Sequence, residues 1–596
     1  MQVRDAQDPR CHADVVFQCS KRSLNLGVLM VSVSLFAAGS LTMAPIARAE
    51  CPDAAQPPDD GNTPATYLVS SVAHLVWIRD ENVGGNNTQL GYDYRQTANV
   101  DFTGCTWSTA IGDSDDYFLG TYDGDGKTIS NLEIDESGAS NLGLFGYIGN
   151  GAEVRNLSIA DASITGSSYV GILAGVTVAG ASIANVSTSG SAEAAGSRVG
   201  GLIGQSGGSV TNSSSTANAK SNAGDYVGGL VGYSSGAITN SSAAGDIAGG
   251  DNFVGGLAGY SSSDITNSSA TGDVTGAAVA IGGLVGGTGG GSITDSSASG
   301  SVSATGAGSG VGGLIGNMNS SGETVLRSSA SGQVSGTGFY FGGLIGSLQK
   351  GSVEKSFATG SVVTPDADQV GGLIGSVTSD VNAVGNSHAS GEVTGDQYVG
   401  GLFGYSGDST QLSDSFAVGQ VTASSSGGGL IGRVASTTAS NSFWDTATSN
   451  QENSAAEGAG EVTGETTANM KTLSTFSDAT WDIGDGWQSG ETWGICDGTT
   501  YPFLIWQYDE SPCSLTAPTV DTAESTSSGF TFNVTNYDSD YDYAFSATSG
   551  SASAGTASGS DLPVTVTGVS GGTSSTVTVT ASRTGYASSD VSLTGR

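Results

Sequence analysis

Residues 251–276 read DNFVGGLAGYSSSDITNSSATGDVTG, and this phrase decides the fold because the chain repeats it. Close copies begin at Asp225 (DYVGGLVGYSSGAITNSSAAGDIAG) and Gln397 (QYVGGLFGYSGDSTQLSDSFAVGQVTA). The last glycine of each core marks eleven copies, 27 to 30 residues apart: Gly146, Gly175, Gly204, Gly232, Gly259, Gly286, Gly316, Gly346, Gly375, Gly404 and Gly432. Such a fixed period predicts stacked units rather than a single ligand-binding glycine loop.

Comparison of the copies separates inward from outward positions. The position of Asn267 holds Asn, Asp, Lys or Arg, so it is expected to face water. Ala270 and Val274 mark positions that are mostly Ala and mostly Val or Ile. This alternation at period two predicts short strands with one buried face, while Phe253, Asn267 and Asp273 face outward. The residue after Asn267 is serine in nine copies and is predicted to form an inward ladder: Ser213, Ser241, Ser268, Ser296, Ser328, Ser356, Ser387, Ser415 and Ser442.

A unit of about 28 residues cannot bury its apolar stripe alone, so the copies must stack. Gly255, Gly256 and Gly259 are interpreted as positions of close backbone packing. We therefore predict an all-β fold whose main body is a parallel β-solenoid (β-helix). Eleven coils at about 4.8 Å per strand would span roughly 50 Å, with further coils expected upstream. A β-propeller is disfavoured because its blades need about 40 residues.

The N-terminus has the pattern of a secretory signal peptide. Lys21 and Arg22 precede an apolar run over 24–45, and Ala47-Arg48-Ala49 forms a cleavage site. The alternative, a membrane anchor, fits the small residues and this site less well, and no later stretch is apolar enough to span a bilayer. We predict a secreted, extracellular or cell-surface protein without a transmembrane segment once residues 1–49 are removed.

Charge and cysteine usage agree with export. Removing residues 1–49 takes five of 18 Lys/Arg and three of 56 Asp/Glu, which leaves 13 basic and 53 acidic residues. So acidic a surface argues against nucleic-acid partners and attracts cations. The four remaining cysteines allow three disulfide connectivities, of which the local pairs close the shorter loops: Cys51 with Cys105 and Cys496 with Cys513.

The chain resembles the GLUG-motif repeat proteins of bacterial surfaces and secretions, a family that includes adhesins and non-catalytic regions of some immunoglobulin A proteases. The resemblance covers roughly residues 65–507 and rests on an ordered set of phrases. The set comprises the eleven cores, the entry FLGTYDGDGKTISNLEI (118–134), the stretch before it (67–112), and the exit NSFWDTATSN (441–450), TTANMKTLSTF (466–476) and TTYPFLIWQ (499–507). The family implies a right-handed solenoid.

The sequence also predicts caps and a separate C-terminal module. All seven Trp lie outside the central copies, where bulky side chains could plug the solenoid ends. Alternating Thr/Val-rich segments after Cys513 suggest a small immunoglobulin-like or fibronectin type III-like β-sandwich. The predicted organisation is a signal peptide (1–49), an N-terminal cap with first coils (50–140), the repeat solenoid (141–445), its C-terminal cap (446–513) and the sandwich (514–596).

Enzymatic motifs are poorly supported. GTYDGDGKTIS fails as a phosphate loop because Thr121 stands where glycine is needed. An H-E-x-x-H metallopeptidase site would need two clustered histidines, but His74 and His388 are far apart in the sequence. The acidic residues show no distinguishable pair of the kind that cleaves polysaccharides. We therefore predict no catalytic residue and no cofactor.

Weaker binding candidates are calcium and surface aromatics. Hard oxygen ligands for calcium could come from three groups of carboxylates: Asp113, Asp115 and Asp116; Asp123 and Asp125; Asp538, Asp540 and Asp542. Solvated turn carboxylates are the alternative. Aromatic residues recur before the cores at Tyr169, Tyr226, Phe253, Tyr340 and Tyr398, and a second outward column is expected at Phe357, His388, Phe416 and Phe443. Either column could grip a sugar or protein surface, or simply cover turn backbone.

These features predict an exported, non-enzymatic solenoid that serves as an adhesin or stalk. Its expected partners are extracellular proteins or glycans, and its oligomeric state is not indicated. The alternative is a carbohydrate-active enzyme built on a solenoid body, which a groove of clustered carboxylates would favour.

Overall fold

The computed structural model describes residues 49–596, apart from residues 63, 81–86, 278, 379–381 and 458–461. The predicted signal peptide, except for Ala49, lies outside the described residues. The described residues form one compact unit. Among the described residues, no helix has the length and apolar character needed to cross a membrane.

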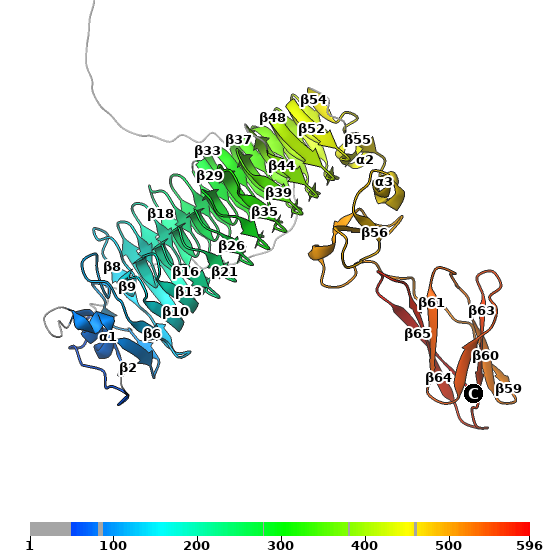
Figure 1. Ribbon diagram of the computed structural model, residues 1–596, viewed down its shortest axis with the longest axis horizontal. Coiled ribbons are helices and arrows are strands. Elements are labelled where there is room, and N and C mark those ends of the chain that lie inside the picture. Colours follow the sequence, from blue (N-terminus) through cyan, green and yellow to red (C-terminus); the bar gives the residue numbers. More distant parts are fainter. Residues whose placement is uncertain (1–48, 63, 81–86, 278, 379–381, 458–461) are drawn as a thin grey trace, which may run out of the picture. The chain divides into compact units, whose positions relative to one another are not determined.

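The main body is the predicted all-β parallel solenoid, with about 13 coils (Figure 1). Each strand pairs in parallel with its equivalent one coil away, as Ile265 does with Ile293 and Val274 with Val302. Further coils precede the first glycine core, as expected, and contain β2 (Thr66–Val69), β3 (Asp93–Gln96) and β6 (Thr121–Asp123). One representative coil consists of β24 (Val254–Gly255), β25 (Ala258–Ser261), β26 (Ile265–Thr266), β27 (Ser269–Ala270) and β28 (Val274–Gly276).

The interior is thin and tightly packed. Val254, Leu257, Ile265 and Val274 are fully buried, and their equivalents in neighbouring coils form one continuous apolar core. A Cβ atom on Gly256 would lie 2.0 Å from the carbonyl oxygen of Gly283 in the next coil. Because such a contact is impossible without moving backbone, the prediction that the core glycines allow close packing is confirmed.

The serine column forms a hydrogen-bonded relay between coils. The backbone N–H of Ser241 donates to Oγ of Ser268, whose N–H donates to Oγ of Ser296, at 3.2 and 3.1 Å. The same relay continues to Ser415. Each hydroxyl in turn donates to the carbonyl oxygen two residues before it, as Ser268 does to Thr266 at 2.9 Å. The predicted inward ladder is confirmed, since all nine serines are at most 3% exposed.

The preceding column, which contains Asn267, adopts the left-handed backbone conformation in all eleven coils that carry a glycine core. Its members have φ between 44° and 56°. Asparagine tolerates this region better than most side chains do. The side chains also bond from coil to coil, as Asn267 Nδ2 does to Asn240 Oδ1 at 2.7 Å. The members of this left-handed column are Asn156, Asn185, Asn212, Asn240, Asn267, Asp295, Arg327, Lys355, Asn386, Asp414 and Asn441.

The N-terminal end of the solenoid is covered by helix α1 (Val72–Asp80) and the segment around it. Trp77 is nearly buried and Trp107 is fully buried. The strand β1 (Ala49–Glu50) pairs with β5 (Cys105–Thr106), next to a disulfide between Cys51 and Cys105. This end therefore combines bulky side chains with a covalent link, as predicted.

At the other end, Trp444 occupies the position that is alanine in the preceding coils. It pairs with Ala417, lies 4% exposed and donates its indole N–H to the carbonyl of Gln451 at 3.1 Å. A Cβ on Gly429 would lie 2.1 Å from this indole. The large ring therefore fills the interior near this end of the solenoid, as predicted for a plug, and only β54 (Ala455–Glu457) and β55 (Thr463–Glu465) stack beyond it among the described residues. Helix α2 (Thr446–Ser449) follows directly.

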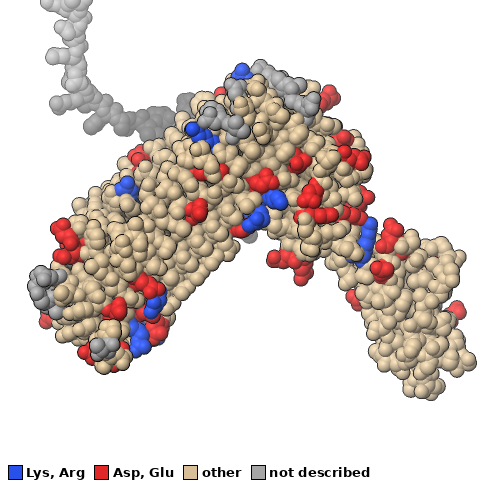
Figure 2. Space-filling model, in the orientation of Figure 1, with Lys and Arg blue, Asp and Glu red and all other residues tan. Residues whose placement is uncertain are grey.

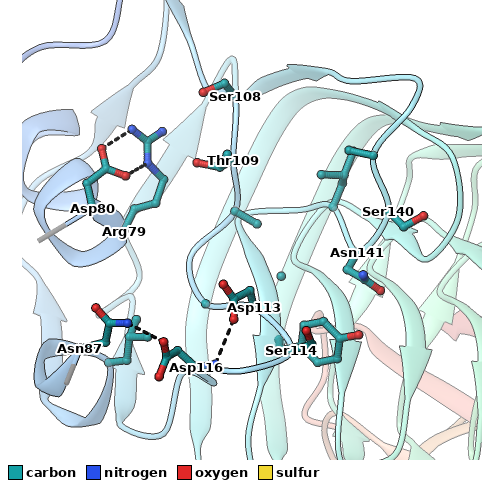
Figure 3. Close-up of a pocket in the computed structure, with 17 residues that line it drawn as sticks. Arg79, Asp80, Asn87, Ser108, Thr109, Asp113, Ser114, Asp116, Ser140 and Asn141 are labelled. Carbon is teal, nitrogen blue, oxygen red and sulfur yellow. Dashed lines mark hydrogen bonds and ion pairs between the residues drawn. The ribbon is translucent and has the colours of Figure 1, made fainter. Parts of the chain in front are cut away.

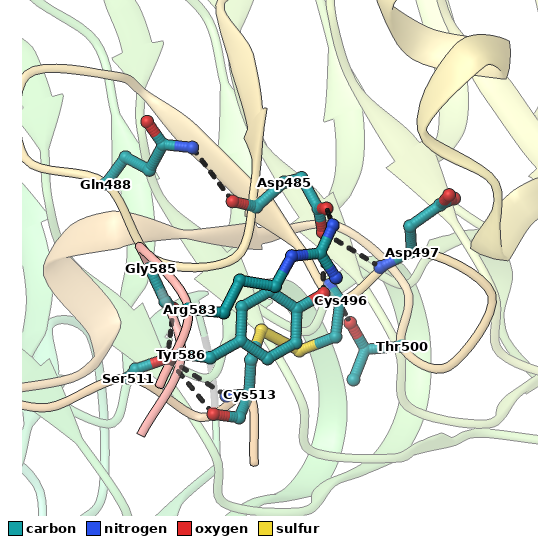
Figure 4. The surroundings of a disulfide bond; sticks show 10 residues. All are labelled: Asp485, Gln488, Cys496, Asp497, Thr500, Ser511, Cys513, Arg583, Gly585 and Tyr586. Carbon is teal, nitrogen blue, oxygen red and sulfur yellow. Dashed lines mark hydrogen bonds and ion pairs between the residues drawn. A yellow bond between two sulfur atoms is a disulfide. The ribbon is translucent and has the colours of Figure 1, made fainter. Parts of the chain in front are cut away.

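Residues 466–513, here called the C-terminal strap, contain helix α3 (Leu473–Ser477) and a small sheet. Its strands are β56 (Ile483–Asp485), β57 (Trp493–Ile495) and β58 (Phe503–Leu504). The second disulfide, Cys496–Cys513, closes this region (Figure 4). Beside it, the carboxylate of Asp485 accepts hydrogen bonds from the side chains of Arg583 and Tyr586. Both predicted local disulfide pairings are thus present.

The C-terminal module is a β-sandwich. One antiparallel sheet has the order β59-β60-β63-β62 and the other β61-β64-β65, around a shared core that includes Phe530 and Val577. Its immunoglobulin-like or fibronectin-like character stays a prediction. The strands are β59 (Glu524–Thr526), β60 (Gly529–Val534), β61 (Asp542–Ala547), β62 (Ser551–Ala554), β63 (Leu562–Thr567), β64 (Ser575–Ser582) and β65 (Ser589–Gly595).

Candidate interaction surfaces

The first predicted aromatic column has an unusual backbone. Tyr169, Tyr226, Phe253, Tyr340 and Tyr398 all have φ between 55° and 67°, and all are half-buried. This conformation is strained for bulky side chains, typically by about 1 kcal/mol or more each. Because this backbone conformation recurs at the same position in successive coils, the strain adds up along the solenoid. Favourable packing of the side chains must therefore offset it.

That packing comes from a neighbouring column that the sequence analysis missed. Tyr226 stacks on Phe253 with ring centroids 5.3 Å apart, and Tyr233 stacks on Tyr260 at 5.5 Å. The two stacks meet edge to face, as Tyr226 does with Tyr233. Arg198 closes one end, with its guanidinium carbon 4.7 Å from the Tyr169 ring centroid. The signal for the second stack was the tyrosine of the recurring phrase G-Y-S-S.

The stacking limits how the rings of Tyr226, Tyr233, Phe253 and Tyr260, here called the aromatic cluster, can contact a partner. Because the rings lie face to face, their faces contact one another, so solvent meets mainly ring edges and hydroxyl groups. At the far end, the Phe253 ring covers Gly287, where an added Cβ would lie 2.6 Å from it. The cluster therefore covers turn backbone and also offers a half-exposed patch suited to hydrogen bonding.

The remaining members of the column belong to separate clusters. Arg433 donates to the hydroxyl of Tyr398 at 3.0 Å, and its guanidinium lies over that ring. Tyr340 lies beside Phe339, which is 49% exposed. The structure thus divides the predicted column into three patches instead of one uninterrupted surface.

The second predicted column does not face solvent, and that expectation was wrong. Phe416 is 1% exposed, and Phe443 and His388 are each 6% exposed. His388 stacks between Phe357 and Phe416 at 5.1 and 4.9 Å. Burial lowers the pKa of His388 to about 4, so the ring is neutral near pH 7.

The C-terminal strap buries this column. Its tryptophans were expected to plug the solenoid end, but three of them lie along the flank. Each donates its indole N–H to the left-handed column: Trp481 to the carbonyl of Asn441 at 2.8 Å, Trp493 to the side-chain oxygen of Asn386 at 3.0 Å, and Trp506 to the carbonyl of Lys355 at 2.9 Å. The strap therefore runs back over several coils, and the buried column is its docking surface.

Two of the first calcium candidates, Asp113 and Asp116, line a pocket of about 430 Å³ near the N-terminal end (Figure 3). Asp113 accepts hydrogen bonds from the backbone N–H groups of Asp115 and Asp116, while the Asp116 carboxylate accepts one from Asn87. These bonds hold a turn in shape. Asp115 is exposed and is not among the pocket residues.

The other candidates are similarly engaged. Asp123 binds Arg155 and Asn156 at 2.9 and 3.0 Å, and Asp538 accepts from the backbone of Asp540. Asp125 lies 3.7 Å from Lys127, and Asp542 is exposed at the start of β61. Over the described part of the chain, no three His, Cys, Asp or Glu side chains converge in a group able to hold a metal ion.

Stacked parallel coils, laddered inward residues and capped ends define the class: a β-solenoid repeat protein. Four consecutive segments match the family model of the GLUG motif: 195–220, 223–248, 253–275 and 277–303. The solenoid therefore contains GLUG-motif repeats, as the sequence resemblance indicated.

Two named proteins share sequence with the repeats. Halomucin of Haloquadratum walsbyi is 36% identical over 156 residues, which is 24% of this chain and 2% of halomucin. A protein described as a Gly-rich membrane protein of Evansella cellulosilytica is 36% identical over 106 residues, or 18% of this chain and 12% of that protein. The chain thus matches only a small part of either relative.

A crystal structure described as an immunoglobulin A1 protease from Bacteroides ovatus covers 51% of this chain and 78% of its own. It has 20% sequence identity and a TM-score of 0.29. At that score the overlap carries no argument about function.

Proposed function

We propose that the protein is an exported, non-enzymatic repeat protein that acts at or outside the cell surface, as an adhesin or a stalk. The observation that carries this proposal is the in-register stacking of the coils, which places equivalent outward residues in columns along the solenoid. A partner that meets one coil meets nearly the same groups on the next, so weak contacts can add up.

Three further features support export and a surface role. The two disulfides suit an oxidising compartment. The chain carries a formal charge of −38, and acidic side chains are spread widely over the face shown in Figure 2, where basic ones are few. The two named relatives are a mucin-like and a membrane protein by their names.

The proposal is tested by probing residues 50–596 on arrays of glycans and extracellular proteins, with and without calcium. The same ligands are incubated with the protein and assayed for cleavage products. Saturable binding without turnover supports adhesion, and absence of both supports the stalk role. Product formation would contradict the proposal and favour the polysaccharide-cleaving alternative.

A further inference from the structure

A second pocket, of about 460 Å³, lies between the solenoid flank and the C-terminal strap. Arg327 and Lys355 line it from the solenoid, and Trp487, Trp506 and Tyr508 line it from the strap. Its volume falls within the usual range for small-molecule sites. It is separate from the aromatic cluster around Tyr226.

The solenoid wall of this pocket carries positive charge in a strongly acidic protein. Arg327 and Lys355 are consecutive members of the left-handed column. Its nine other members are all Asn or Asp. Arg327 is neutralised by Asp295, through contacts of 2.6 and 2.7 Å. The Lys355 ammonium has no ion pair with any carboxylate in the described ranges. One cation without a direct ion-pair partner among the described residues therefore lines the pocket.

The strap wall is aromatic and held in place. Trp506 donates its indole N–H to the carbonyl of Lys355 itself, and Trp487 donates to the carbonyl of Ile505 at 3.0 Å. Both rings are thereby fixed before any ligand arrives. Tyr508 remains 43% exposed at the pocket. Preorganised aromatic rings of this kind lose little entropy when they pack against a ligand.

Acidic side chains complete the lining. Glu491 and Asp509 lie in the same pocket as Lys355. Carboxylates accept hydrogen bonds from hydroxyl groups, whereas they would repel a ligand that carried only negative charge. The pocket thus combines a cation, aromatic rings and hydroxyl acceptors, which excludes a simple inorganic anion as the best fit.

We propose that this pocket binds a carboxylate-bearing sugar, such as a uronic acid residue of an acidic polysaccharide. The sugar carboxylate would pair with Lys355, its C–H face would pack on the strap aromatics, and its hydroxyls would donate to Glu491 and Asp509. The site is independent of the repeated surface columns, so it stands even if those columns bind nothing.

The test is calorimetric titration of the exported protein with tri-galacturonate at low ionic strength, with the neutral trisaccharide maltotriose as the comparison ligand. We expect saturable binding of the acidic sugar and little of the neutral one. Lys355→Gln should weaken binding about tenfold or more, because a charged hydrogen bond is lost. Lys220→Gln, which alters an exposed ion pair with Glu193 elsewhere on the solenoid, should have no effect.

Lys355 is only partly buried, so its substitution should leave the melting temperature nearly unchanged, and this serves as the folding check. The indole N–H signals of Trp487 and Trp506 provide a second readout and should shift on titration. The proposal is overturned if tri-galacturonate does not saturate, if maltotriose binds equally well, or if Lys355→Gln binds like the unaltered protein.

Discussion

The backbone N–H of Ser268 donates to Oγ of Ser296 in the next coil, at 3.1 Å. The Ser296 hydroxyl donates in turn to the carbonyl of Thr294, at 2.8 Å. Serine therefore supplies both an acceptor and a donor directly after the left-handed residue, where the backbone has just turned sharply. No apolar residue of similar size could satisfy both groups, which explains why serine recurs there.

Ser296→Ala should destabilise the protein by about 1–3 kcal/mol, because it leaves the buried N–H of Ser268 without its acceptor. Amide exchange at Ser268 should accelerate as well. The matched control is Ser299→Ala in the same coil, since Ser299 is exposed. Denaturant midpoints and hydrogen exchange measure both variants, and equal effects of the two would refute the relay's role.

Gly256→Ala should be among the most destabilising single substitutions in the solenoid. The new Cβ would meet the Gly283 carbonyl at 2.0 Å and the Ala270 Cβ at 2.8 Å, so neighbouring coils must separate. We expect a loss of several kcal/mol or failure to fold. Gly138→Ala is the control, because nothing lies within 4 Å of its added Cβ. A Gly256→Ala protein with an unchanged melting temperature would contradict the packing described here.

Stability should fall as the pH is lowered from 6.5 towards 4, partly because of His388. The unfolded chain takes up a proton on this ring near pH 6.5, whereas burial lowers the folded-state pKa to about 4. The folded state is thus disfavoured progressively across this window, by up to about 3 kcal/mol. His388→Phe preserves the ring between Phe357 and Phe416 and should remove this component. Chemical denaturation at several pH values measures the free energy of unfolding of both proteins. If this free energy depended on pH in the same way in both, His388 would make no such contribution.

Asn267→Val should cost about 1–2 kcal/mol, because a β-branched residue is strained at φ of 47° and the bond to Asn240 is lost. Asn267→Gly removes the same side-chain bond without the backbone strain, and so it should cost less. Melting temperatures of the two variants compare these contributions. If glycine were the more damaging replacement, backbone conformation would not explain why asparagine recurs in the left-handed column.

Sequence periodicity was enough to predict the solenoid, its inward serine, alanine and valine positions, and its core glycines. The repeated use of Asn, Asp, Arg and Lys at the position of Asn267 indicated exposure, but not the left-handed backbone. That information was present in the asparagine preference, because asparagine is enriched where φ is positive.

The placement of the strap could not be predicted in the same way. Phe416 and Phe443 look like outward residues within their own coils, and only the non-repeating segment with Trp481 and Trp493 turns them into core. Periodicity specifies contacts between neighbouring coils, whereas the strap docks through residues far away in sequence: Trp506 and Lys355 are 151 positions apart.

The most direct test of the account measures whether equivalent outward residues form straight columns along the solenoid. Thr216, Ser331 and Ser390 are exposed and equivalent, separated by four and then two coils. Spin labels on cysteines introduced pairwise at these positions allow distances to be measured by double electron–electron resonance. With about 4.8 Å per coil, the 216–331 and 216–390 pairs should be separated by roughly 19 and 29 Å, respectively, before allowance for the label tethers. Distances that fail to grow with coil number, or that shorten as the chain closes on itself, would contradict the stacked, repetitive surface on which the proposed function rests.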